Sequence, residues 1–256
     1  GGGYGDGGVG GEWGEISIDG WDAFDSIAND DPSLWSISYT QLMDFFQEAK
    51  TFYGDLFATK TMRDICTDMI EPLCNEHGTS YALQRNPSGL PVHAFISHAW
   101  DEPFGDFVDS IDKVFQTSLK KPNVWICAFA LVQGVSDDCM QEQLGIDDKC
   151  GFEACPFVIS LQKAKKFVVV RNSVTDLYSR IWCVCELMFA KKFELVPEHT
   201  FVTGPDCFSK SRTSCIEAQA TNIDDKARIL SVLLANHDYK EIDDFVNRFR
   251  AQGAPK

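Results

Sequence analysis

Apolar residues along the first part of the chain recur every three or four positions, which is the spacing of one face of an α-helix. This spacing predicts an amphipathic helix over 39–57 and a second helix that starts at Thr59 or Thr61 and stops near 77. The apolar positions are Leu42, Phe45, Phe46, Ala49 and Phe52, then Met62, Ile65, Met69, Ile70 and Leu73. We expect both helices to form an N-terminal cap over 38–90, which ends at the turn sequence Asn-Pro-Ser-Gly.

After this turn the pattern changes to continuous apolar runs that alternate with helical segments. The runs cover 92–97, 124–131 and 166–173, and a further strand is expected from 193–197 and 200–203. Helices are expected over 103–118, 155–165 and 177–191. Continuous apolar runs are typical of strands buried on both faces, and their alternation with helices predicts an α/β fold with a parallel sheet and right-handed crossovers.

Two short helices are expected to close the chain, over 223–235 and 239–251, with starts marked by Asn222 and Asp238. The whole chain then divides into four parts. These are a glycine-rich acidic arm (1–37), the helical cap (38–90), the α/β domain (91–205), and a C-terminal helical extension packed on the same domain (206–256).

Charge and cysteine content narrow the function classes. The formal net charge of -15 repels phosphate backbones and anionic lipid headgroups, which argues against nucleic acid and membrane surfaces as partners. No apolar run approaches the roughly 18 residues that span a bilayer, so membrane insertion is not expected. Most of the ten cysteines lie in apolar segments, so we interpret them as reduced core thiols, and their spacing predicts no metal site. We therefore expect an intracellular protein. The cytoplasm is the default compartment, and an organelle such as a plastid is the alternative.

The arm carries four aromatic residues among glycines and aspartates: Tyr4, Trp13, Trp21 and Phe24. Such side chains can anchor a segment on a protein partner, whereas glycine opposes a fixed conformation. A partner-binding arm and a disordered acidic leader both remain open.

Two segments carry candidate chemistry. The first follows the strand at 92–97, where an open parallel sheet binds ligands, and it contains His98, Trp100 and Asp101. Each also has a structural interpretation, as a loop histidine, a packing lid and a helix cap respectively.

The second segment is the predicted helix over 177–191, where Glu186 is the only charged residue between 181 and 190. A lone carboxylate in so apolar a helix needs a cation, several donors or a cleft. Trp182 lies one turn earlier on the same face and would place an aromatic ring beside the Glu186 carboxylate. An ion pair of Glu186 with Arg180, Arg171 or a lysine is the alternative.

Four stretches, taken in order, resemble the Toll/interleukin-receptor/resistance (TIR) domain. They are HAFISHAW, FGDFVDSI, FVISLQKAKKFVVVRNS and SRIWCVCELMFAKK, within 92–203, and the WCxxEL element is the most specific. The chain looks most like the divergent TIR-like proteins of unicellular algae and other protists. The resemblance implies a flavodoxin-like parallel sheet with helices on both faces.

The resemblance also implies two functional hypotheses. The first is a non-catalytic interaction module, an accessory or scaffold subunit that docks through its arm, with self-association through 134–154. The alternative is an NAD hydrolase in which Glu186 is the catalytic carboxylate and NAD is the substrate, with no cofactor. The residues that would line its pocket or bind substrate are Ser97, His98, Trp100, Asp101, Trp182 and Arg171. The arm, and the His98-Ala99 pair where many TIR enzymes have a basic residue, favour the module.

Overall fold

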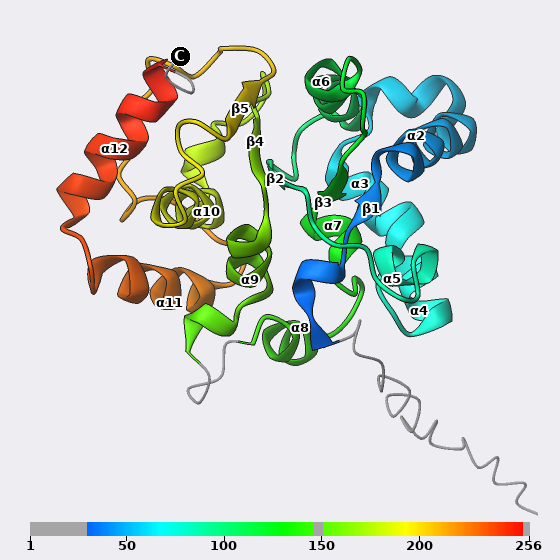
Figure 1. Ribbon diagram of the computed structural model, residues 1–256, viewed down its shortest axis with the longest axis horizontal. Helices are drawn as coiled ribbons and strands as arrows, with labels where there is room; N and C mark the ends of the chain where they lie inside the picture. The colour runs from blue at the N-terminus through cyan, green and yellow to red at the C-terminus, as the bar shows by residue number, and fades with distance from the viewer. Residues whose placement is uncertain (1–29, 146–150, 253–256) are drawn as a thin grey trace, which may run out of the picture.

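The fold is a five-stranded sheet with helices on both faces (Figure 1). The computed structural model of the chain describes residues 30–145 and 151–252. The strand order is β1-β3-β2-β4-β5. The strands are β1 (Ile37–Ser38), β2 (Ala94–Ser97), β3 (Asn123–Trp125), β4 (Lys166–Val170) and β5 (Thr200–Thr203).

Strands β2, β3, β4 and β5 run parallel to one another, with Phe95 of β2 opposite Trp125 on one side and Phe167 on the other. Strand β1 pairs antiparallel with β3 at the sheet edge. The expectation of a wholly parallel sheet was therefore wrong at this edge. A two-residue strand is too short to leave a periodic signal in the sequence.

The helices form one layer on each side of the sheet, with α2 to α6 on one face and α9 to α12 on the other (Figure 1). The first layer comprises α2 (Tyr39–Tyr53), α3 (Met62–Ile65), α4 (Glu71–His77), α5 (Tyr81–Arg85) and α6 (Phe104–Phe115). The second comprises α9 (Pro156–Lys163), α10 (Ile181–Lys192), α11 (Ile223–Leu234) and α12 (Tyr239–Gln252). The short helices α7 (Cys127–Ala130) and α8 (Asp137–Gln143) follow β3.

The central strands β2 and β4 are buried on both faces, as their apolar runs predicted. Along β2 and β4, Phe95 and Phe167 join one hydrophobic core, whereas Ile96 and Val168 join the other. The second core also contains Leu42 and other residues of α2. The helical cap and the sheet therefore share one core, because the apolar stripe of α2 has no other surface to cover it.

The two N-terminal helices begin where side chains can cap them. Ser38 and Gln41 form a capping box at the start of α2, and Thr61 and Asp64 form another at α3. After α2 a 3₁₀ segment (Gly54–Thr59) completes the helix expected over 39–57. The helix expected to end near 77 is also present, as α3, a π-helical segment (Cys66–Ile70) and α4.

Two expected strands were wrong. The run at 124–131 leaves the sheet after Trp125 and turns into α7, because short apolar runs fit a buried helical turn as well as a strand. Residues 193–197 form turns, with Glu194 at a φ of 60°, and only 200–203 pairs in the sheet. Helices α5 and α8 had not been expected. Helix α5 lies in the cap before its closing turn, and α8 lies in the 134–154 segment.

The nine described cysteines are all free, and most are buried. None of the helices in the described ranges is long and apolar enough to cross a membrane. The arm residues Tyr4, Trp13, Trp21 and Phe24 lie outside the described residues, as do 146–150 of the 134–154 segment.

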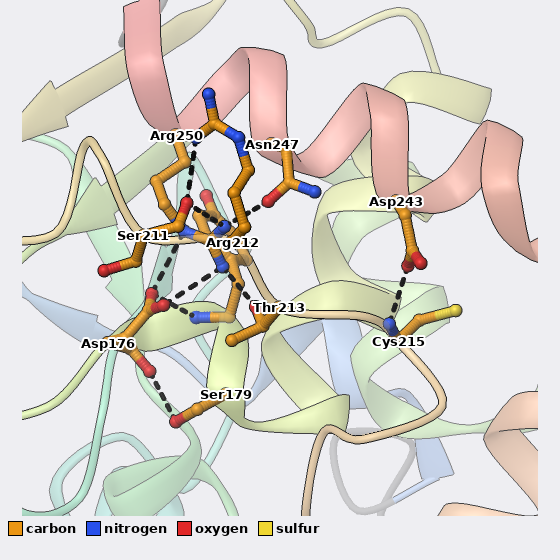
Figure 2. A network of polar contacts seen from close by, with 10 residues as sticks. Asp176, Ser179, Ser211, Arg212, Thr213, Cys215, Asp243, Asn247 and Arg250 are labelled. Atoms are coloured by element: carbon orange, nitrogen blue, oxygen red, sulfur yellow. Dashed lines mark hydrogen bonds and ion pairs between the residues drawn. The ribbon is translucent and has the colours of Figure 1, made fainter.

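The C-terminal helix α12 is fixed to the α/β core by a buried ion pair (Figure 2). The guanidinium of Arg250 lies 3.1 Å from a carboxylate oxygen of Asp176 and also donates to the main-chain oxygen of Ser211. Near the other end of the same helix, Asp243 accepts from the main-chain nitrogen of Cys215 at 2.7 Å. These contacts tie α12 to the loop before α10 and to the segment after β5.

We expect Arg250→Met to lower the free energy of unfolding by about 3–5 kcal/mol, because it leaves the Asp176 carboxylate buried without its counter-ion. Arg248 is exposed on the same helix, so Arg248→Met is the matched control and should change stability by no more than about 0.5 kcal/mol. Urea unfolding measures both. Equal losses in the two variants would show that the ion pair does not hold α12.

Candidate functional site

A cavity of about 520 Å³ opens where β2 and β3 end. Its volume lies in the usual range of ligand sites, roughly 300–1,000 Å³. His98 directly follows β2 and Cys127 follows β3, so the cavity lies at the carboxyl edge of the parallel strands, where α/β sheets bind ligands. Lining residues that matter for the chemistry are Arg63, His98, Trp100, Cys127, Arg180, Trp182, Glu186 and Asp225.

Glu186 projects from α10, a helix that is apolar and buried over most of its surface. The Ser97 hydroxyl at the end of β2 donates a hydrogen bond to Oε2 of Glu186. Burial raises the pKa of Glu186 to about 7, although Ser97, His98 and Arg180 each lower it in part. The carboxyl group can therefore gain or lose a proton near neutral pH, as a general base or a charge-stabilising group requires.

Trp182 is held rigidly on the cavity wall. Its ring stacks on Phe157, with centroids 4.7 Å apart, and its Nε1 donates to Asp225 of α11 at 3.3 Å. Asp225 also accepts from Gln141 of α8 at 2.9 Å. Trp100 contributes a second indole, with the guanidinium of Arg63 5.9 Å from its ring. The cavity wall thus carries two indoles, and that of Trp182 also stacks on Phe152, with centroids 6.1 Å apart.

Two arginines supply positive charge to the cavity wall. Arg63 is already paired with Asp101 at 3.0 Å. Arg180 is half-buried, and within the described part of the chain its guanidinium has no hydrogen bond or ion pair. Arg180 is therefore the cation that can accept an anionic group of a ligand without losing a protein contact.

The structure brings together five of the residues expected from the sequence. His98, Trp100, Trp182 and Glu186 line the cavity, and Ser97 donates a hydrogen bond to the Glu186 carboxylate. It does not bring in the other two. Asp101 pairs with Arg63 and is not part of the cavity wall. Arg171 pairs with Asp206 at 2.9 Å and faces a separate small pocket.

Several residues of the site were not identified by sequence reasoning. Cys127 was taken for a core thiol, and Asp225 sits in the C-terminal extension, which had been assigned no role at the site. Glu102 was given no role, and it is fully buried against the His98 ring. Only the position of His98 and Glu102 four residues apart signalled their contact, and nothing in the sequence related them to Cys127.

No protein-family model, curated protein or solved structure matches the chain. The resemblance to TIR domains therefore rests on the motifs themselves and remains a hypothesis.

The pKa of Glu186 has a measurable consequence for stability. Between its ordinary value of 4.5 and about 7, the folded chain keeps a proton on Glu186 that the unfolded chain has released. Stability therefore falls as pH rises through this interval. The amide in Glu186→Gln does not titrate and can still accept the hydrogen bond from Ser97. Relative to this variant, the free energy of unfolding of the wild type should fall by on the order of 2–3 kcal/mol between pH 4.5 and 7.5.

Denaturant unfolding at a series of pH values measures this difference. Glu198 is exposed, and Glu198→Gln serves as the control that should follow the wild-type curve. A constant gap between wild type and Glu186→Gln over the whole pH range would contradict the raised pKa.

Proposed function

We propose that this chain hydrolyses the nicotinamide–ribosyl bond of NAD, with Glu186 as the catalytic carboxylate. The observation that carries the proposal is the position of Glu186. Its carboxylate is buried and accepts a hydrogen bond from Ser97, and it faces a ligand-sized cavity rather than being closed in an ion pair. The order of the parallel strands, β3-β2-β4-β5, supports it, since it corresponds to the first four strands of the flavodoxin-like order that the TIR resemblance implies.

The chemistry needs little beyond a well-placed carboxylate. Cleavage of the C1′–N bond leaves nicotinamide as a neutral ring, so the leaving group requires no acid. The ribose develops oxocarbenium character, which the Glu186 carboxylate stabilises in the low-dielectric cavity. Water then adds to C1′ and gives up a proton, which the same carboxylate can accept. The products are nicotinamide, ADP-ribose and one proton.

The cavity wall suits the remaining parts of the substrate. The indoles of Trp100 and Trp182 can stack on a planar base. The guanidinium of Arg180 can pair with the pyrophosphate. Arg180 thus fills the role for which the sequence offered no basic residue after the first strand.

The interaction-module hypothesis finds no specific support at this site. Its proposed docking residues, from Tyr4 to Phe24, lie outside the described residues. In the described part of the 134–154 segment, Gln141 of α8 binds Asp225 beside the cavity. That contact relates the segment to the ligand site rather than to a second chain.

The proposal predicts that purified protein releases nicotinamide from NAD and that Glu186→Gln lowers kcat about 100-fold or more. The wild-type rate should rise with pH through about 7, since the ionised carboxylate is the active form. Chromatography of nicotinamide at several protein concentrations measures both. Glu198→Gln should keep the wild-type rate. Absence of turnover at every concentration, or equal turnover in Glu186→Gln, would overturn the proposal.

Arg180 provides a test of substrate binding. A hydrogen bond to a charged group contributes about 1.5–3 kcal/mol, so Arg180→Met should raise the KM for NAD roughly tenfold to a hundredfold with a smaller change in kcat. Nicotinamide riboside has no phosphate, and its KM should be unaffected. Arg171→Met, which changes a guanidinium outside the cavity, should leave both values unchanged. A KM rise for riboside as large as that for NAD would show that Arg180 does not bind the pyrophosphate.

A further inference from the structure

A second chemical group faces the same cavity and has no role in the proposed hydrolysis. The thiol of Cys127 lies 3.4 Å from Nε2 of His98. On the other side of the ring, Nδ1 of His98 lies 3.1 Å from the Glu102 carboxylate. Thiol, imidazole and carboxylate thus follow one another in the order that activates a nucleophile, with a base beside the sulfur and an acidic group that orients the base.

The environment fixes the histidine in one tautomer. Nδ1 also lies 3.3 Å from the main-chain oxygen of Ala99, which can only accept a hydrogen bond. Nδ1 therefore carries a proton, and Nε2 is left to accept the proton of the Cys127 thiol. The ring is further restrained by Phe107, 4.9 Å away between centroids. These contacts hold the base in place before any ligand enters.

The two partners of the His98 ring favour its protonated form. Burial alone lowers the pKa of His98, but Cys127 and Glu102 at its two nitrogens outweigh burial and raise that pKa. A protonated imidazole stabilises a thiolate beside it, as in other reactive cysteines. A metal site does not explain the cluster, because Cys127 and Glu102 contact opposite ring nitrogens and cannot converge on one ion with His98.

We propose that Cys127, His98 and Glu102 form a nucleophilic thiol site that exchanges with small disulfides entering the cavity. The Cys127 thiolate attacks one sulfur of a disulfide R–S–S–R, and a new S–S bond forms as the old one breaks. The departing R–S⁻ takes up a proton, so Cys127 is oxidised and the second half of the disulfide is reduced. Cys127 is the nucleophile, and Glu102 is a positioning residue that acts through His98.

Thiol–disulfide exchange requires less of this wall than acyl transfer does. Attack on a carbonyl requires hydrogen-bond donors for the developing oxyanion. The side-chain nitrogen of Gln133, which lines the cavity, already donates to the main-chain oxygens of Cys127 and Leu131 at 3.3 and 3.4 Å. Thiol–disulfide exchange needs no such donors, because the departing sulfur carries the charge away.

Other titratable groups that face this cluster come from five elements. They are Arg63 of α3, Cys66 of the π-helical segment, Glu71 of α4, Asp106 of α6, and Cys183 and Glu186 of α10. Among these, Cys183 is the natural comparison. It lines the same cavity, but its sulfur contacts the main-chain oxygen of His98 rather than a ring nitrogen, and burial raises its pKa well above the ordinary value.

The test compares three cysteines within one intact protein. Cys127 lines the cavity and contacts the imidazole of His98, whereas Cys183 lines the cavity without contacting a ring nitrogen. Cys207 is exposed and has no histidine contact in the described ranges. The full chain is treated with oxidised glutathione at pH 6 and pH 8.5, and mass spectrometry of unreduced peptides gives the rate at each site. A thiol with an imidazole nitrogen 3.4 Å from its sulfur should react about tenfold faster at pH 6 than a thiol with no base beside it.

At pH 6 we expect Cys127 to react fastest, Cys207 more slowly and Cys183 slowest. At pH 8.5 the difference in rate between Cys127 and Cys207 should be smaller. Glu102→Gln keeps an acceptor for His98 but removes the charge, so it should slow Cys127 at pH 6 by roughly tenfold and leave Cys207 unchanged. Reaction of Cys127 no faster than Cys207 at pH 6 would overturn the proposal. So would an unchanged Cys127 rate in folded Glu102→Gln protein. Because the readout is a peptide mass, the result does not depend on whether the chain turns over NAD.

Discussion

The hydrogen bond from Ser97 to Glu186 joins the end of strand β2 to the middle of helix α10. Close packing limits how an apolar helix can rotate on an apolar sheet, and a buried carboxylate that loses its donor adds a further penalty or must be neutralised. The bond therefore adds a polar constraint on the rotation of α10 about its axis. With that rotation set, Trp182 faces the cavity one turn before Glu186, and the sulfur of Cys183 reaches the main-chain oxygen of His98.

Polar groups gather at this end of the sheet in a way that does not serve stability. Glu102 and His98 are buried together, and one oxygen of Glu102 has no hydrogen-bond partner among the described residues. Replacing such groups with apolar ones of similar volume often stabilises a protein. Glu186, His98 and the Cys127 thiol line one cavity, and Glu102 lies behind the histidine. Ionisable groups with shifted pKa values in a cleft are typical of functional sites.

The sequence predicted the parts of this site that come from local pattern. The apolar runs of β2 and β4 indicated buried parallel strands, and the lone carboxylate in an apolar helix singled out Glu186. The sequence could not indicate contacts set by the sheet order. Ser97 and Glu186 are 89 residues apart, and His98 and Cys127 are 29 apart, so only the pairing of β2 with its neighbours brings them together. The run at 124–131 also concealed Cys127, because an apolar turn of helix and an apolar strand share one composition.

The C-terminal helices, which the sequence set apart as an extension, complete the cavity. Asp225 of α11 binds the indole of Trp182, and α11 and α12 pack their apolar faces on the core that also holds α10. The Arg250–Asp176 pair fastens α12 to the loop that leads into α10, just before Arg180. The guanidinium and the indole that would bind a nucleotide are thus positioned from the C-terminal side, while Ser97 positions the carboxylate from the sheet. The site depends on both, and neither the α/β domain nor the extension builds it alone.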